Sequence, residues 1–122
     1  MKYAYLWIIL LVFLDQGTKY FFPGIKNTGG VFGILTEWTL VFIILGIIVL
    51  LFLIFFVKHA HRYGRFAVIL LISGILGNLI DRIFLGYVRD FVDLKFWPVF
   101  NLADSYTTIG IAILLFYFWK KK

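Results

Sequence analysis

The sequence predicts an all-α membrane protein with four transmembrane helices and both termini in the cytoplasm. Hydrophobic residues make up 63% of the 122 positions and charged residues 15%. In soluble domains roughly half of the residues are hydrophobic and about a quarter are charged. Four segments are long and apolar enough to cross a bilayer. The basic residues gather on one side of those segments, which orients the helices. A chain of this length, residues 1–122, is a single domain.

Each predicted helix approaches the ~20 apolar residues that a bilayer requires. The second is the clearest because its apolar run is uninterrupted, whereas the first carries Asp15, Gln16 and Lys19 in its later part. No small-residue cleavage site follows the first segment, so we expect a retained helix rather than a cleaved signal peptide. The four predicted spans are Tyr3–Phe22, Trp38–Val57, Phe66–Leu85 and Ala103–Trp119.

Charge orients these spans. One side carries seven basic residues and no acid: Lys2, Lys58, Arg62, Arg65, Lys120, Lys121 and Lys122. The other side, with the adjacent helix ends, holds all six acids: Asp15, Glu37, Asp81, Asp90, Asp93 and Asp104. The positive-inside rule therefore places both termini in the cytoplasm and the acids outside. This topology accounts for the net charge of +6, so no nucleic-acid partner is expected.

Composition excludes several kinds of site. The chain has no cysteine, so a disulfide, a thiolate metal site and a thiol nucleophile are excluded. Its only histidines, His59 and His61, lie together in a basic segment, which leaves no ligand set for zinc or iron. We therefore expect neither a metal nor another cofactor. A serine–lysine dyad has little support, because Ser73 falls below the polar layer described next.

Polar residues of three predicted helices fall at one depth. At ~1.5 Å per residue from the cytoplasmic ends, Asp15 lies about 18 Å up the first helix and Asp104 about 22 Å up the fourth. Asn78, Asp81 and Arg82 lie about 18 to 24 Å up the third. In a hydrocarbon core ~30 Å thick, this forms one layer near the outer face. Charged groups in a bilayer are costly and usually mark function.

Some of these residues have a structural interpretation. Asp15 and Lys19 are spaced i, i+4 with the acid first, the favourable order for an ion pair, and Asp81 has Arg82 beside it. Such neutralised pairs can simply tie helices together. The sequence leaves this interpretation open beside a functional one.

Asp90 and Asp104 differ from those pairs. Asp90 follows the third span, and Asp104 begins the fourth, where Asn101 is a suitable N-cap. Asp104 could merely complement the helix dipole, and Arg89 could pair with Asp90. Alternatively, the apolar connection FVDLKFWPVFNLA folds back and brings the two acids together.

Two adjacent carboxylates share a proton and titrate as a pair. One can then act as a base on water while the other, protonated, donates to a carbonyl oxygen. This is the chemistry of an aspartic peptidase, which needs no metal and no covalent nucleophile. It suits the side chains that this sequence offers.

Five short blocks resemble the signature blocks of bacterial lipoprotein signal peptidases, the type II signal peptidases. They are LDQGTKY at 14–20, NTGGVFG at 27–33, GNLIDR at 77–82, GYVRDF at 86–91 and WPVFNLADS at 97–105. Their order and spacing extend the resemblance over nearly the whole chain. The resemblance implies an aspartic endopeptidase of the bacterial cytoplasmic membrane, which acts near the extracytoplasmic face as a monomer among membrane lipids. Its substrate would be a diacylglyceryl-modified prolipoprotein, cut just before the lipidated cysteine.

The motifs also imply roles for individual residues. The catalytic pair would be Asp90 of the V-x-D-F block and Asp104 of the N-x-A-D block. The surrounding and supporting positions would be Asn78, Asp81, Arg82, Asn101, Asp15, Lys19 and Asn27. Only seven residues, Tyr20–Lys26, separate Lys19 from Asn27, so a short or divergent member with a reduced β-cradle is expected.

Two other functions fit part of the pattern. A small proton- or ion-coupled transporter would also use intramembrane Asp, Arg and Asn, but it needs polar groups at several depths. A non-catalytic membrane scaffold would tolerate the loss of either Asp90 or Asp104. Aromatic residues of the last connection (Phe91, Phe96, Trp97 and Phe100) could either seal a catalytic cleft or anchor the chain at the interface.

Overall fold

The computed structural model describes residues 2–28 and 36–122, and within them it is mostly helical with one small sheet. Gly30 and Val31, in the second signature block, lie outside the described residues. The helices are α1 (Ala4–Phe21), α2 (Thr36–Val57), α3 (Arg62–Leu85) and α4 (Leu102–Lys120). The strands are β1 (Ile25–Asn27) and β2 (Val88–Asp90).

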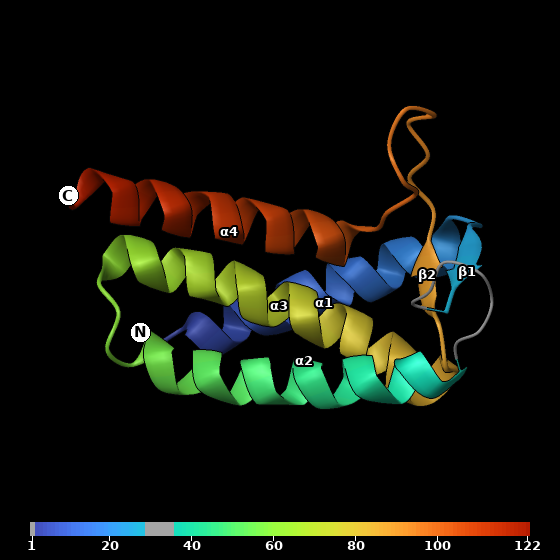
Figure 1. The fold of residues 1–122 in the computed structure, drawn as a ribbon, viewed down its shortest axis with the longest axis horizontal. Coiled ribbons are helices and arrows are strands. Elements are labelled where there is room, and N and C mark those ends of the chain that lie inside the picture. Colours follow the sequence, from blue (N-terminus) through green and yellow to red (C-terminus); the bar gives the residue numbers. More distant parts are fainter. Residues whose placement is uncertain (1, 29–35) are drawn as a thin grey trace.

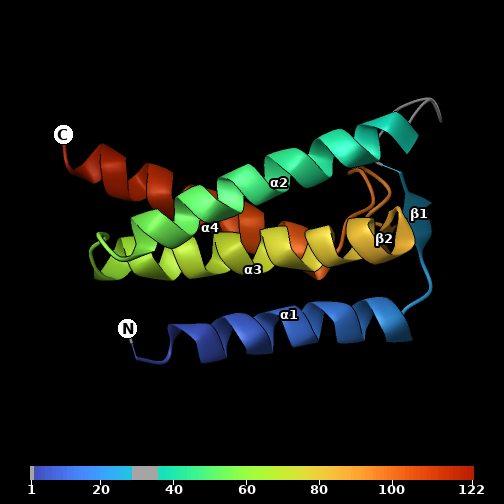
Figure 2. The same ribbon diagram turned by 90° about the horizontal axis from the view of Figure 1, so that it is seen from below.

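Helix α3 lies at the centre of the bundle and packs against α1, α2 and α4 (Figures 1 and 2). It therefore contributes more buried residues than any other element of the described chain, from Gly64 to Asp81. The outer helices bury one side only, so that Phe52 and Phe55 of α2 remain more than 60% exposed. Large apolar side chains on an outer surface are what a lipid environment stabilises.

Three helical segments of the described chain are long and apolar enough to cross a membrane: Trp38–Val57, Arg62–Leu85 and Leu102–Lys120. Helix α1 is not among them, because Asp15, Gln16 and Lys19 interrupt its apolar pattern. The fold class is thus confirmed as mostly helical with three candidate spans. The fourth span remains a prediction.

Helix α3 begins at Arg62, four residues before the predicted Phe66. The prediction counted only apolar residues, whereas arginine is a good helix former that can extend a span into the interface. His61 is the N-cap, and Gly86 ends the helix in the left-handed conformation (φ 79°), which glycine adopts at little cost. Gly86 thereby turns the chain directly into β2.

Close helix contacts depend on small residues. A Cβ atom at Gly77 of α3 would overlap the carboxylate of Asp15 in α1, and one at Gly74 would overlap Thr107 in α4. Small residues at such positions let membrane helices approach closely. The polar end of α1 is therefore held directly against α3.

The sheet joins two segments that are far apart in sequence. Strand β1 pairs antiparallel with β2, in a register that places Ile25 opposite Asp90 and Asn27 opposite Val88. A bridge between Val92 and Phe100 then closes the neck of the following loop. The sheet lies at one end of the bundle, and both termini lie at the other (Figure 1).

Candidate active site

The site is built around the start of α4. Asn101 is the N-cap: its Oδ1 accepts from the Asp104 N–H at 2.9 Å, and its own N–H donates to Asp104 Oδ2 at 3.0 Å. This reciprocal arrangement is a capping box, which satisfies N–H groups that have no partner within the helix. The predicted N-cap is confirmed, and Asp104 is held in a single orientation.

Asn101 also reaches Asp90. Its Nδ2 donates to Asp90 Oδ1 at 2.8 Å and to Asn78 Oδ1 at 3.0 Å. The bridge between Val92 and Phe100 makes this possible, because it draws the chain after β2 toward the start of α4. One side chain therefore contacts both predicted catalytic acids.

The remaining oxygens of these acids also accept from amides. Asn27 Nδ2 donates to Asp90 Oδ2 at 2.9 Å, and Asn78 Nδ2 donates to Asp104 Oδ1 at 2.9 Å. Within the described residues, neither acid forms an ion pair. We call Asp90 and Asp104 the amide-bound pair.

Burial raises the pKa of Asp90 above its ordinary value, and the nearby charge of Asp104 raises it further. The hydrogen bonds from Asn27 and Asn101 act in the opposite direction without reversing the shift. Asp90 is 2% exposed, so its charged form is poorly hydrated. This environment makes Asp90 harder to ionise than an exposed aspartate.

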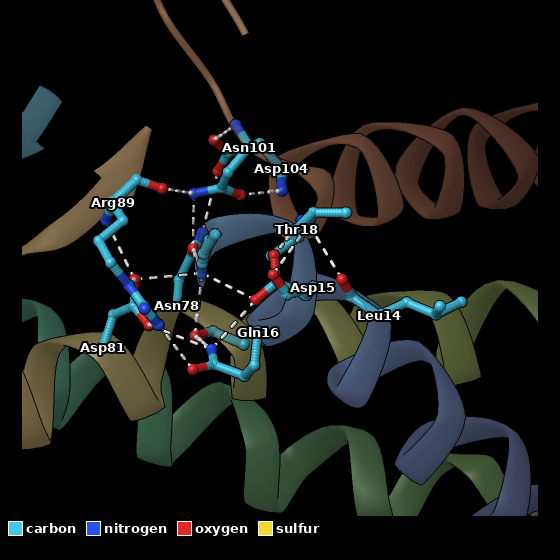
Figure 3. A network of polar contacts seen from close by, with 12 residues as sticks. Leu14, Asp15, Gln16, Thr18, Asn78, Asp81, Arg89, Asn101 and Asp104 are labelled. Carbon is cyan, nitrogen blue, oxygen red and sulfur yellow. Dashed lines mark hydrogen bonds and ion pairs between the residues drawn. The ribbon is translucent and has the colours of Figure 1, made fainter. Parts of the chain in front are cut away.

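A second group of charged residues lies near Asp104, and Figure 3 labels three of its members, Asp15, Asp81 and Arg89. Lys19 Nζ is 2.8 Å from Asp15 Oδ2 and 3.3 Å from Asp81 Oδ2, and Arg89 Nη2 is 2.9 Å from Asp81 Oδ1. We call Asp15, Lys19, Asp81 and Arg89 the ion-pair cluster. Its two acids and two bases balance in charge, as burial in an apolar bundle requires.

The ion-pair cluster also supports the start of α4. Asp15 Oδ1 accepts from the Ala103 N–H at 2.9 Å, so a side chain of α1 caps a free donor of α4. Lys19 Nζ donates to Asn78 Oδ1 at 3.1 Å, which links the cluster to the amide-bound pair. Both groups thus belong to one hydrogen-bonded network.

Two neighbour pairs suggested by the sequence do not form. Asp81 pairs with Lys19 and Arg89 rather than with Arg82, and Arg89 pairs with Asp81 rather than with Asp90. Consecutive helical residues point in different directions, so Asp81 faces α1 while Arg82 lies 5.0 Å over the ring of Phe42 in α2.

Sequence reasoning missed two members of the network. Arg89 Nη2 donates to Gln16 Oε1 at 2.7 Å, and Gln16 Nε2 donates to Asp81 Oδ1 at 3.1 Å. The sequence did indicate Gln16, because it is a polar residue next to Asp15 in an otherwise apolar segment. Arg89 gave no such signal, because its partner depends on the path of β2.

Two cavities open onto Asp104. One, of about 350 Å³, lies between α4 and the loop at 91–100 and includes Phe96, Trp97 and Phe100. The other, of about 370 Å³, lies among α2, α3 and α4 and includes Asn78 and Arg82. Both have mainly apolar walls with a few polar groups, as substrate pockets commonly do. In the described residues, His, Asp and Glu do not gather in threes that could hold a metal.

Comparison with known proteins gives a consistent result. The family model described as Signal peptidase (SPase) II matches residues 7–120. A lipoprotein signal peptidase from Halothermothrix orenii is 43% identical over 100 residues, which cover 80% of this chain and 69% of that protein. One from Streptococcus pyogenes serotype M1 is 36% identical over 139 residues, which cover 94% of this chain and 91% of that protein.

Solved structures resemble the whole chain. A bacterial membrane enzyme structure determined by the in meso method at 2.3 Å matches with a TM-score of 0.85 and 34% identity, covering 98% of this chain and 89% of that one. Another, at 1.9 Å, has a TM-score of 0.88 and 31% identity, with 100% and 96% covered. The likeness of the backbone therefore extends over nearly the whole chain.

Proposed function

The chain belongs to the signal peptidase II family of membrane proteases, and from this premise we propose that it removes signal peptides from diacylglyceryl-modified prolipoproteins. The proposed enzyme is a single domain, residues 1–122, that works as a monomer in the bacterial cytoplasmic membrane. It has four transmembrane helices, with α1 as the fourth span, and both termini in the cytoplasm. The active site faces the extracytoplasmic side, where β1 and β2 form a reduced cradle.

We propose that Asp90 and Asp104 are the catalytic residues. The observation that carries this assignment is that Asn101 contacts both acids, at 2.8 Å to Asp90 and 2.9 Å to the Asp104 N–H. Their hydrogen-bond partners are amides, and in the described residues no cation forms an ion pair with either acid. Asp104 also opens onto two cavities, which gives a substrate a route to the pair.

The two acids have different environments, and this suggests different roles. Asp104 lies in the first turn of α4, where the helix dipole stabilises a carboxylate. In the proposed reaction, Asp104 takes a proton from water while the water oxygen attacks the scissile carbonyl carbon. Protonated Asp90 donates to the carbonyl oxygen, which gives a tetrahedral diol. The C–N bond then breaks as the proton taken by Asp104 passes to the leaving amine and a diol hydroxyl returns a proton to Asp90.

The other predicted site residues would position this pair. Asn27, Asn78 and Asn101 hold the carboxylates in place. Asp15, Lys19 and Asp81 form the rigid base beneath them. Arg82 lines one cavity together with Asp104, where its cation could contact polar substrate groups.

A transporter is less well supported. A permeation path needs polar groups through the whole depth of a bundle. Among the described residues, the buried charged and amide side chains lie at the end that carries the sheet, and Ser73 beneath them donates to its own helix at Ile69 O. This one-sided distribution favours an interfacial site.

The test is cleavage by purified protein of one preprotein in two forms, with and without the diacylglyceryl group. We expect cleavage of the lipidated form only, inhibition by a cyclic-peptide inhibitor of the family, and activity that falls as pH rises through the raised pKa of Asp90. Equal cleavage of both forms would contradict the proposed substrate. No cleavage of either form by folded protein would contradict the proposed activity.

A further inference from the structure

A third cavity lies at the end of the bundle farthest from the sheet. It has a volume of about 520 Å³ and lies between the early part of α1 and the early part of α3. We call it the basal groove, and its lining residues are Trp7, Leu11, Arg62, Arg65, Phe66, Ile69 and Leu70. The catalytic proposal uses none of these residues. The groove therefore needs an explanation of its own.

The basal groove combines an apolar wall with two cations. Arg62 and Arg65 are spaced i, i+3, which places them on one face of α3. In the described chain neither guanidinium forms an ion pair. Arg65 Nε donates to Ala60 O at 2.6 Å, which restrains its position. The groove thus offers two charges that no protein group neutralises.

The surroundings add positive charge and an interfacial aromatic residue. The basal groove lies on the side predicted to be cytoplasmic, which carries no acid. That side also holds five lysines: Lys2, Lys58, Lys120, Lys121 and Lys122. Trp7 is 58% exposed on the groove wall, and tryptophan favours the level of lipid headgroups. A ligand for this site has a negative head and an apolar tail.

We propose that the basal groove binds one anionic phospholipid of the surrounding membrane. Its phosphate contacts Arg62 and Arg65, and an acyl chain lies against Leu11, Phe66 and Ile69. Basic pockets between transmembrane helices are suited to anionic headgroups. Arginine in particular offers paired N–H donors to a phosphate. A bound lipid would hold α1 against α3 at the end opposite the polar network.

The test measures lipid binding rather than cleavage, so its result does not depend on the proposed function. Purified protein in detergent is titrated with phosphatidylglycerol or phosphatidylcholine, and retained lipid is measured by native mass spectrometry. We expect wild type to retain phosphatidylglycerol preferentially. Each arginine near an anionic lipid contributes ~1 kcal/mol, or about fivefold in affinity, so Arg62→Gln/Arg65→Gln should bind about 25-fold more weakly.

A matched control separates a site from general charge. Lys120→Gln/Lys121→Gln removes the same charge from the same topological side, outside the groove, and should keep phosphatidylglycerol affinity within about twofold. Arg62→Gln alone, whose side chain makes no hydrogen bond in the described chain, should lose about fivefold even if the double variant folds poorly. Equal losses in the arginine and lysine variants would overturn the proposal. So would equal retention of both lipids, or competition by glycerol phosphate as strong as by the whole lipid.

Discussion

Four aspartates occupy the polar end of this bundle, and they form two groups with opposite kinds of partner. Asp15 and Asp81 of the ion-pair cluster contact Lys19 and Arg89. The amide-bound pair, Asp90 and Asp104, receives hydrogen bonds from asparagine side chains and a backbone N–H. Asp15, Asp81 and Asp90 are all buried, whereas Asp104 is half-buried and borders two cavities. Burial therefore does not separate the two groups, but the kind of partner does.

The comparison indicates how one polar layer can serve two purposes. A carboxylate beside a cation stays ionised and holds helices together, because protonation would leave the cation unpaired. A carboxylate held only by amides keeps its position yet can still gain or lose a proton. Structural acids and candidate catalytic acids therefore differ in whether a cation touches them.

The largest expected effect comes from the amide-bound pair. Asp90→Asn and Asp104→Asn should each lower the cleavage rate at least about 100-fold, because each removes a proton acceptor or donor. Asparagine preserves the shape, so the variants should fold. The measurements are cleavage of lipidated preprotein and the melting temperature in detergent.

Asp93 provides the matched control for that prediction. It lies three residues beyond Asp90, is exposed, and pairs with Lys95 at 3.2 Å. The Lys95 backbone N–H lowers the pKa of Asp93, so this acid holds no proton for catalysis. Asp93→Asn should keep activity within about twofold. If Asp93→Asn loses as much activity as Asp90→Asn, the wrong acids were chosen. The same follows if either variant of the amide-bound pair retains substantial cleavage activity.

The second effect tests the ion-pair cluster through stability. Lys19 is 4% exposed and contacts both Asp15 and Asp81. Lys19→Met leaves an excess of buried negative charge and should lower the free energy of unfolding by ~3–5 kcal/mol. The measurement is denaturant or thermal unfolding in a fixed detergent.

An exposed ion pair supplies the control for Lys19. Lys95→Met breaks the solvent-facing contact with Asp93 and should leave stability nearly unchanged. Asp15→Asn combined with Lys19→Met should recover part of the lost stability, because it removes one unpaired acid. If Lys19→Met is as stable as Lys95→Met, the cluster does not hold the helices together.

A smaller effect is expected at Arg89, which connects the two groups. Its guanidinium contacts Asp81 and Gln16, while the next residue in β2 is Asp90. Arg89→Met should lower kcat about tenfold with little change in KM, because small displacements of a reacting group reduce its rate. Arg89→Lys keeps the charge without the paired donors and should recover part of the loss. A change in KM alone would argue against positioning.

Much of the bundle and the height of its polar layer could be predicted from the sequence. Apolar runs mark helices, and the rise per residue places Asp15, Asp81 and Asp104 at one level. The N-cap role of Asn101 followed from local chemistry alone. These features depend on neighbours in sequence, which is why they were accessible.

Long-range pairing was not accessible in the same way. Strands β1 and β2 are three residues each, too short to show a periodic pattern. In β2, Arg89 and Asp90 are consecutive and point to opposite faces, so Arg89 reaches Asp81 rather than Asp90. Adjacency in sequence suggested the pairs Asp81–Arg82 and Arg89–Asp90, and side-chain direction overrode both.

The smallest expected effect is the pH dependence of stability, which distinguishes the two kinds of acid directly. The folded-state pKa of Asp90 is raised above its ordinary value of 3.8. Between pH 3.8 and this raised pKa, the folded state therefore binds more protons than the unfolded state. The free energy of unfolding contributed by Asp90 is therefore present below 3.8 and falls as pH rises to the raised pKa. The Asn side chain of Asp90→Asn does not titrate. The melting temperature of this variant should therefore rise relative to that of wild type as pH increases from 3.8 to the raised pKa of Asp90. Above that pKa the difference between the two should stay constant.

Asp93→Asn should show the opposite sign, because the pKa of Asp93 is lowered and its stabilisation is lost as pH falls through that value. Melting temperatures of wild type and both variants, measured from about pH 3 to about pH 8, provide the comparison. A constant difference between wild type and Asp90→Asn would mean that Asp90 titrates normally in the folded protein. In that case the absence of a contacting cation would not be enough to hold a proton on a buried acid, and the contrast between the two groups would lose its chemical meaning.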